Sequence, residues 1–273
     1  MRSYAAHHHR AHEGPTVMSE STIWVNGREG GQIPGDDPGL LFGLTAFETL
    51  RTYDGIPFRF EPHLLRLQRS ADAMGLSVPP IEQIRTEILA VCQGNVSIRY
   101  TVTAGGNIIL QRSLIPAGTA GRHVRVSSLS WVNPPSLPGA VKHGCRAAWL
   151  LAARKAQVDE VLLVDPNGHI LEANRSNVFA VVDGRLVTPP LDGRQLAGVT
   201  REALMDAANA AQIDVVETAL HVESDFDELY LASTLKELSP VVECNGRALS
   251  GHGPIGAELH GAFRRLVDAE CGL

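Results

Sequence analysis

The sequence predicts a mixed α/β protein with two domains, a small N-terminal α/β domain and a larger C-terminal domain rich in β-hairpins. The chain has 273 residues, close to the length of about 250–300 residues at which single cores divide into domains. Short runs typical of strands alternate with segments whose apolar residues recur at helical spacing. Asn-Gly and Asp-Gly pairs, which are typical of tight hairpin turns, separate several of the strand-like runs.

Composition narrows the class of protein. The formal charge of −6 and an aromatic content of 5% argue against a surface that binds nucleic acid. The four cysteines have no C-x-x-C spacing, so we expect reduced thiols, no metal site and a cytoplasmic protein. No apolar run approaches the roughly 18 residues that span a bilayer, so we expect no membrane partner.

Proline and glycine mark the expected domain boundary. The first residues contain no apolar stretch of signal-peptide length, so we leave them out of the fold as a tail. Asn133-Pro134-Pro135 and Pro138-Gly139 break the chain and are typical of a linker. The expected organisation is a tail over 1–20, a small domain over 21–132, a linker over 133–141 and a larger domain over 142–273.

The N-terminal domain is expected to be a sheet with a pair of helices. Leu64, Leu67, Ala71 and Met74 recur at helical spacing. The expected helices cover 61–74 and 81–92. The expected strands cover 23–25, 47–53, 57–60, 96–103, 107–112 and 123–128.

The C-terminal domain is expected to hold most of the hairpins. Asp183-Gly184 and Asn245-Gly246 each separate two strand-like runs. The expected helices cover 146–156, 200–211 and 257–269. The expected strands cover 160–164, 170–173, 177–182, 185–187, 215–219 and 228–232, followed by a hairpin over 241–249.

Several polar residues are candidates for chemistry, each with a plain structural alternative. Lys142 directly follows the linker, where burial in a cleft would lower its pKa and make the amine nucleophilic, although a surface lysine fits as well. Glu172 lies in an otherwise apolar strand and is either paired in the interior or on an exposed face. Gly198 and Thr200 begin a helix whose free N–H groups suit an anion, although Thr200 is also a good N-cap.

Two further residues fit an anion site only weakly when taken alone. Thr234 follows a strand and either donates a hydroxyl to the same anion or caps the next turn. Arg66 lies one helical step from an apolar stripe, where it either grips an anion bidentately or extends along the surface.

The order of these blocks resembles the class IV, or fold-type IV, pyridoxal-phosphate enzymes. This family includes branched-chain aminotransferases, D-amino-acid aminotransferases and aminodeoxychorismate lyases. The resemblance covers roughly Ile23 to Leu249. Its most specific blocks are Asp159-Glu160-Val161-Leu162-Leu163-Val164-Asp165, Gly168-His169-Ile170-Leu171-Glu172-Ala173, Ser176-Asn177-Val178-Phe179, Leu196-Ala197-Gly198-Val199-Thr200-Arg201 and Ser239-Pro240-Val241.

The resemblance assigns roles to the candidate residues. It implies that Lys142 forms the Schiff base with pyridoxal 5′-phosphate (PLP) and that Glu172 pairs with the pyridine nitrogen. It implies a homodimer and a transaminase that moves an amino group between an amino acid, of the branched-chain or D type, and a 2-keto acid. The implied phosphate ligands are Arg66, Val199, Thr200 and Thr234.

Substrate choice remains open between two reactions. Arg51 and Arg99 match arginines of the branched-chain subgroup and are the expected carboxylate ligands, unless strand alternation turns them to solvent. Thr49 replaces a glycine of that subgroup, and Lys142-His143-Gly144-Cys145-Arg146 is more similar to the lyases, which release pyruvate and 4-aminobenzoate. A third possibility is a relative of the family that binds the cofactor without catalysis.

Overall fold

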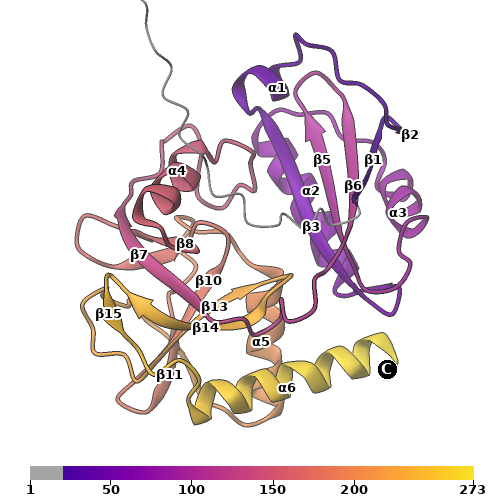
Figure 1. Ribbon diagram of the computed structural model, residues 1–273. Coiled ribbons are helices and arrows are strands. Elements are labelled where there is room, and N and C mark those ends of the chain that lie inside the picture. The colour runs from indigo at the N-terminus through magenta and orange to yellow at the C-terminus, as the bar shows by residue number, and fades with distance from the viewer. Residues whose placement is uncertain (1–20) are drawn as a thin grey trace, which may run out of the picture.

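The computed structural model describes residues 21–273, whose strands form two separate sheets (Figure 1). The tail expected over 1–20 lies outside the described residues. The first part of the chain contains β1 (Ser21–Val25), β2 (Arg28–Glu29), α1 (Pro38–Phe42), β3 (Thr45–Tyr53), β4 (Ile56–Pro57), α2 (Phe60–Ala73), α3 (Ile81–Leu89), β5 (Val96–Thr103) and β6 (Ile108–Leu114).

The first sheet is antiparallel, with helices on one face. Its strand order is β2-β1-β6-β5-β3-β4. The apolar side chains of α2 and α3 pack against alternate residues of β3 and β5, since one face of an antiparallel sheet is enough to form a core. This core includes Leu67, Ile88, Leu50, Ile98 and Tyr100, each fully buried.

The second sheet takes up most of the remaining chain. Its strand order is β12-β11-β10-β13-β14-β7-β8-β9, with β15 paired to β14. The elements of this part are β7 (Val124–Ser130), α4 (Ala147–Ala156), β8 (Glu160–Val164), β9 (Ile170–Ala173), β10 (Asn177–Val182), β11 (Arg185–Thr188), α5 (Val199–Ala210), β12 (Val215–Glu217), β13 (Glu228–Ser233), β14 (Glu237–Cys244), β15 (Arg247–Ala248) and α6 (Pro254–Cys271).

Strand β7 belongs to the second sheet, where it pairs in parallel with β8 and β14. The chain therefore changes sheets between residues 114 and 124, earlier than the linker expected at 133–141. Pro116, Gly118 and Gly121 lie in this earlier crossing. The later prolines instead shape the loop that carries Lys142 to the first sheet.

Most expected elements are present, with differences at their ends. The prediction of a strand over 57–60 was wrong, because β4 ends at Pro57 and α2 already begins at Phe60. Helix α1 was not expected, although Asp37 caps it through a hydrogen bond from the Gly39 N–H and Pro38 is its first residue. One helical turn is too short to show an apolar periodicity.

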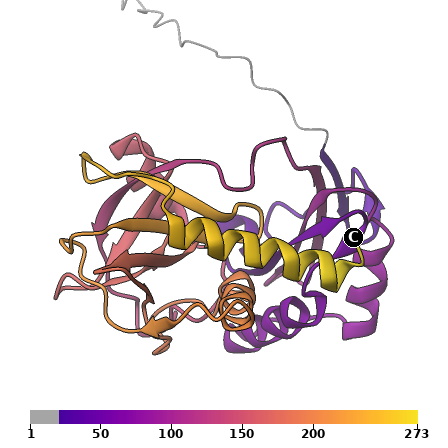
Figure 2. The ribbon, with the colours of Figure 1, turned by 90° about the horizontal axis from the view of Figure 1, so that it is seen from below.

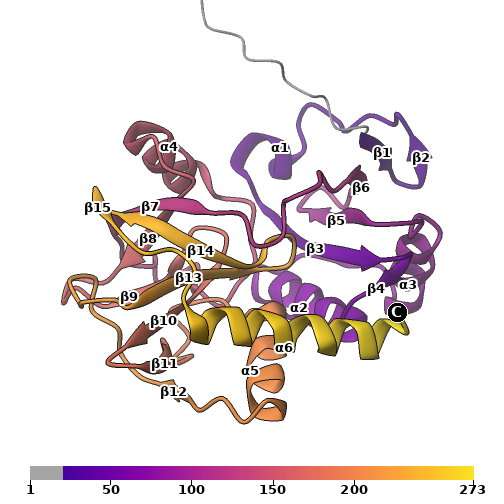
Figure 3. The same ribbon diagram turned by 60° about the horizontal axis from the view of Figure 1, so that its bottom comes forward.

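Helices α5 and α6 join the two halves of the molecule. Both pack on the second sheet around Phe179, Tyr230 and Phe263, and Tyr53 and Phe58 of the first part complete the same core. Helix α6 runs beneath both halves and ends beside the first sheet (Figures 2 and 3). None of the helices within residues 21–273 is both long and apolar enough to cross a membrane.

Candidate active site

Lys142 lies where the loop after β7 docks on the first sheet. Its backbone carbonyl accepts a hydrogen bond from the Phe47 N–H at 3.1 Å, and its own N–H donates to Ser70 Oγ at 3.1 Å. The side chain crosses the ring of Phe47, with Nζ 4.8 Å from the ring centroid. Burial, and then the nearby charge of Arg66, lower the pKa of the Lys142 amine to about 7. A large fraction of the amine is therefore neutral and nucleophilic at neutral pH.

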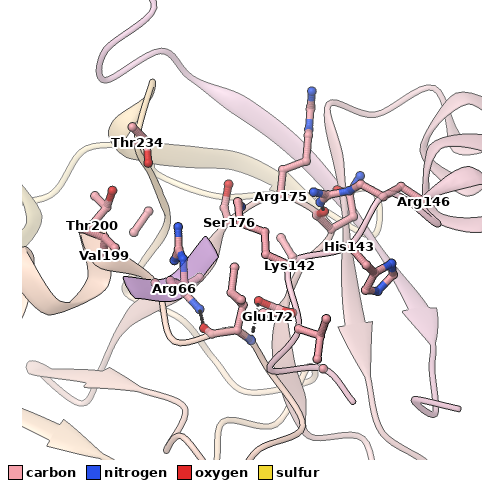
Figure 4. Close-up of a pocket in the computed structure, with 18 of the residues that line it drawn as sticks. Arg66, Lys142, His143, Arg146, Glu172, Arg175, Ser176, Val199, Thr200 and Thr234 are labelled. Carbon is pink, nitrogen blue, oxygen red and sulfur yellow. Dashed lines mark hydrogen bonds between the residues drawn. The ribbon is translucent and has the colours of Figure 1, made fainter. Parts of the chain in front are cut away.

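Glu172 extends from β9 into the same cavity as Lys142. Its carboxylate accepts a hydrogen bond from the Leu196 N–H at 3.3 Å. Burial raises the pKa of Glu172 to about 8, against the lowering effects of that hydrogen bond and of Lys142. The two residues that the sequence singles out first, thirty positions apart, therefore share one cavity (Figure 4).

Arg66 is fixed beside this cavity by the buried Glu48 of β3 and by the loop before α5. Its guanidinium makes two hydrogen bonds to Glu48, at 2.7 and 2.9 Å, and donates a third to the Ala197 carbonyl at 2.8 Å. His63 contacts the same Glu48 carboxylate at 2.7 Å. Arg66 thus enters the cavity in one orientation, already attached to the loop before α5.

The N-terminus of α5 forms one end of the cavity. Val199 and Thr200 line it. The N-cap residue is Gly198, which has no side chain that could accept hydrogen bonds from the first N–H groups of the helix. Such N–H groups and the helix dipole favour an anion. Gly198 is required because a Cβ there would collide with the amide oxygen of Asn177. Thr234, which follows β13, lines the same cavity, and Figure 4 shows its hydroxyl on the side of Val199 and Thr200.

The two expected carboxylate ligands have different positions. Arg99 lies on β5 and lines an outer cavity that also contains Lys142 and Thr234. Arg51 lines neither cavity with Lys142. It instead donates to the Leu235 carbonyl at 2.8 Å and forms an ion pair with Glu237 at 3.1 Å. The structure therefore brings Arg99 to the site but makes Arg51 a support for the turn that holds Thr234.

Sequence reasoning missed several residues that shape the site. Glu48 and His63 orient Arg66, although neither residue was a candidate from the sequence. Asn177 fixes the loop before α5 by donating to the Leu196 carbonyl at 2.9 Å. Arg146, noted only as a departure from a pattern, lines both the inner and the outer cavity.

The inner cavity combines three chemical features. It contains a half-buried amine of lowered pKa, a half-buried carboxylic acid and an anion-binding end made of an arginine and a helix N-terminus. These suit an aldehyde that also carries a basic ring nitrogen and a phosphate. Within residues 21–273, no group of three or more His, Cys, Asp or Glu side chains is arranged to hold a metal ion.

Comparison with known proteins agrees with this geometry. Residues 45–244 match the family described as amino-transferase class IV. A Thermotoga maritima protein is 33% identical over 234 residues, covering 81% of this chain and 85% of that protein. The branched-chain-amino-acid aminotransferase of Escherichia coli is 28% identical over 93% of this chain and 96% of its own length.

Solved structures agree with the sequence comparison. The branched-chain aminotransferase of Thermoproteus uzoniensis, solved with norvaline, superposes with a TM-score of 0.79 at 26% identity, covering 91% of this chain and 95% of that chain. The family match extends over most of the chain and includes Lys142, Glu172 and the start of α5. The chain is therefore a member of the class IV aminotransferases, with their fold-type IV architecture.

Proposed function

We propose that this enzyme is a PLP-dependent transaminase acting on an amino acid and a 2-keto acid. The observation that carries the proposal is the shared cavity of Lys142, Glu172 and the N-terminus of α5. The residues fit PLP because an amine, a half-buried acid and an anion-binding end match its aldehyde, ring nitrogen and phosphate. The proposed phosphate ligands are Arg66, Val199, Thr200 and Thr234.

Each residue has a role that follows from its environment. PLP, when bound, draws the electrons released at the substrate α-carbon into its ring. The Lys142 amine, with a pKa of about 7, would hold the aldehyde of the cofactor and would carry the proton taken from the substrate α-carbon. Glu172 is half-buried and has no cationic partner at hydrogen-bond distance among residues 21–273, so a protonated ring nitrogen would provide one and keep the carboxylate ionised.

The substrate proposal is a transaminase for an amino acid of the branched-chain or D type. Two relatives of known sequence or structure carry the branched-chain name. Arg99, which lines the outer cavity beside Lys142, is the proposed ligand of the substrate carboxylate. The lyase reaction needs the same lysine, but it releases pyruvate and requires no 2-keto acid as acceptor.

Covalent trapping tests the role of Lys142. The protein purified with PLP should absorb as a bound cofactor, and borohydride treatment followed by peptide mapping should place a pyridoxyl group on Lys142. Lys142→Ala should lose this adduct while keeping its fold by circular dichroism. Lys155→Ala, at an exposed lysine of α4, is the matched control and should keep it. An adduct retained in Lys142→Ala would contradict the assignment.

A panel of half-reactions tests the reaction itself. Each L- and D-amino acid is added to the loaded enzyme while the absorption band of the cofactor is followed. A transaminase converts the band with its donors in the absence of any acceptor. If no amino acid changes the band but aminodeoxychorismate yields pyruvate, the lyase is the correct assignment.

We further propose a homodimer in the cytoplasm. Leu41 and Phe42 of α1 and Leu150 and Leu151 of α4 are all more than half exposed. Cys145 connects the two helices through a hydrogen bond from Sγ to the Gly43 carbonyl at 3.2 Å. Exposed apolar side chains on neighbouring helices suit contact with a second copy, which sedimentation velocity would detect. All four cysteines are free, as suits a reducing compartment.

A further inference from the structure

Glu160 is a fully buried carboxylate for which the proposed function has no role. It begins β8, whose remaining residues are all apolar and buried. A carboxylate in such surroundings is stable only with close partners that donate hydrogen bonds or carry a positive charge. The positions of these partners therefore show which parts of the molecule Glu160 holds in place.

Two partners of Glu160 lie in the turn that follows β9, the strand of Glu172. Glu160 accepts hydrogen bonds from the Arg175 N–H at 3.0 Å and from the Ser176 hydroxyl at 3.0 Å. Both residues line the inner cavity (Figure 4). The Arg175 guanidinium also approaches the carboxylate, at 4.0 Å, from a half-exposed side chain. Glu160 therefore fixes this turn mainly through a backbone N–H and a hydroxyl.

The third partner of Glu160 lies in a separate turn, the tip of the β13–β14 hairpin. The last pair of this hairpin is Ser233 with Glu237, so the residues between them form the tip. The Lys236 ammonium of the tip forms an ion pair with the Glu160 carboxylate, and the exposed fractions of the two side chains are only 14% and 0%. Thr234 lies at the same tip, two residues before Lys236. Glu160 thus connects the tip that carries Thr234 to the turn after β9.

The strand ladders do not provide this connection. The ladder between β10 and β13 ends at the pair of Asn177 with Ala232, before either turn begins. Two further hydrogen bonds hold the tip, one from Arg51 of β3 and one from the N–H of Gly121, in the crossing between the sheets. Among the hydrogen bonds and ion pairs within residues 21–273, only those of Glu160 link the two turns.

We propose that Glu160 is a positioning residue of the cofactor site, which acts through Lys236 to hold the Thr234 hydroxyl against the phosphate. Loss of the carboxylate would leave the Lys236 ammonium unpaired in a shielded place, so the tip would move to bring the charge to water. The inference rests on the proposed function, because Thr234 is a phosphate ligand only under that proposal.

A direct effect of the charge of Glu160 would have the opposite sign. Removing a negative charge and freeing the positive charge of Lys236 would strengthen the binding of a nearby anion. Displacement of the tip would instead weaken it. The direction of the change in phosphate affinity therefore distinguishes positioning from simple electrostatics.

Pyridoxal has the aldehyde and ring of PLP but no phosphate, so it separates the contribution of the tip from that of the rest of the site. The full chain is freed of cofactor, and the dissociation constants of PLP and pyridoxal are measured by fluorescence titration. Glu160→Gln should weaken PLP about tenfold and pyridoxal less than about twofold, because the displaced tip loses a hydrogen bond to a charged group that only PLP carries. Equal or tighter binding of PLP, or equal weakening of both ligands, would overturn the proposal.

Glu228→Gln is the matched control for the loss of a buried carboxylate. Glu228 lies on β13 of the same sheet, accepts hydrogen bonds from the Tyr230 hydroxyl and from N–H groups in the first turn of α6, and lines neither cavity. The control should leave the ratio of the two dissociation constants unchanged. The same change of ratio in both variants would overturn the proposal, since any lost buried carboxylate would then have this effect.

The double variant Glu160→Gln/Lys236→Met tests whether Glu160 acts through Lys236. It removes both charges, so the net charge stays the same and no unpaired ion is left in the interior. It should weaken PLP by about the same tenfold as Glu160→Gln alone, since two residues that act through one contact are not additive. If Glu160→Gln does not fold, the double variant replaces it, and an unchanged PLP affinity would overturn the proposal.

Thr234→Val separates this inference from the proposed function. It should weaken PLP but not pyridoxal, as expected for the loss of a phosphate ligand. If it does so while Glu160→Gln does not, the positioning role is wrong and the proposed function stands. If the wild type binds neither PLP nor pyridoxal, the proposed function itself fails, and this inference fails with it.

Discussion

Lys142 and Glu172 have pKa values shifted in opposite directions by the same cause. Burial disfavours the charged form of each group, so the pKa of Lys142 falls to about 7 and that of Glu172 rises to about 8. The cavity thus contains two groups with pKa values near 7, so that a bound ligand can change the protonation state of each. A solvated lysine or a carboxylate on an exposed strand face would not show these shifts.

The raised pKa of Glu172 predicts a pH-dependent stability of the unliganded enzyme. The folded-state pKa of about 8 exceeds the ordinary value of 4.5, so the folded protein binds an extra proton between these values. The free energy of unfolding should therefore fall as pH rises from about 4.5 to 8, by at most about 1.4 kcal/mol per pH unit. Glu172→Gln should lack this component, so urea unfolding at pH 5 and pH 8 should show the variant gaining relative to the wild type.

Adding PLP provides the control for this prediction. If the carboxylate pairs with the protonated ring nitrogen as proposed, the relative gain of Glu172→Gln at pH 8 should disappear once the cofactor is bound. If the stability difference between Glu172→Gln and the wild type is the same at both pH values, with and without PLP, the raised pKa of an unpaired Glu172 is contradicted.

At the scale of single residues, the sequence predicted which residue types form the site better than it predicted which of them reach the cavity. Lys142 and Glu172 were open to plain structural explanations by local position alone, and they became identifiable through the order of the surrounding motifs, which resembles the class IV enzymes. Arg51 and Arg99 both lie on strands of the first sheet, yet only Arg99 reaches the cavity. The difference depends on where Glu237 and the turn at Leu235 are placed by the second sheet, and no local pattern in β3 contains that information.

At the scale of elements, the start of α5 depends on one close approach. The amide oxygen of Asn177 occupies the space where a side chain at Gly198 would be, and the Asn177 amide also donates to the Leu196 carbonyl. This packing fixes the direction of the first N–H groups of the helix. The anion-binding end of the cavity therefore requires both a helix and a glycine at its N-cap.

Gly198→Ala should weaken cofactor binding more than it unfolds the protein. The added methyl group must displace Asn177 or turn the first residues of α5, at a cost of about 1–3 kcal/mol in stability. Because Val199 and Thr200 would then point away from the phosphate, the dissociation constant for PLP should rise about tenfold in a fluorescence titration. Gly35→Ala is the matched control, since nothing lies within 4 Å of a Cβ there. An unchanged PLP affinity in Gly198→Ala would exclude a phosphate at this helix.

Whole elements were predictable to the extent that their patterns are local. Apolar residues at helical spacing predicted helices such as α2. The Asn-Gly and Asp-Gly pairs predicted the hairpin turns. The sequence could not predict that β7 belongs to the second sheet, because its neighbours β8 and β14 come later in the chain. Parallel pairing between distant segments leaves no mark in the sequence of the strand itself.

At the scale of the whole molecule, Glu237 links the two sheets. Its buried carboxylate accepts hydrogen bonds from Tyr53 at 2.9 Å and Arg264 at 2.9 Å, contacts His260 at 2.8 Å and forms the ion pair with Arg51. These partners come from β3 of the first sheet and from α6. Glu237 itself has a φ of +58°, a left-handed conformation that is uncommon outside glycine and asparagine. The contacts hold the turn that carries Thr234.

Glu237→Gln should destabilise the molecule at neutral pH and much less in acid. Its partners, chiefly His260 and Arg51, lower the pKa of Glu237 to about 2, against an ordinary value of 4.5 and the opposing effect of burial. The stabilisation is therefore complete above about pH 4.5 and is lost as pH falls through 2. Removing the charge leaves Arg51 without a counter-ion, at a cost of about 3 kcal/mol in the free energy of unfolding at pH 7.

Urea unfolding at pH 7 and pH 3 measures this difference, and the gap between wild type and Glu237→Gln should narrow at the lower pH. Glu270→Gln is the matched control, because Glu270 pairs with Arg59 between the same parts of the molecule but is partly exposed. Its loss should cost at most about 1 kcal/mol at either pH. Equal effects of the two substitutions would show that burial adds nothing to the Glu237 contact, and that the sheets are joined by the apolar packing of α5 and α6 alone.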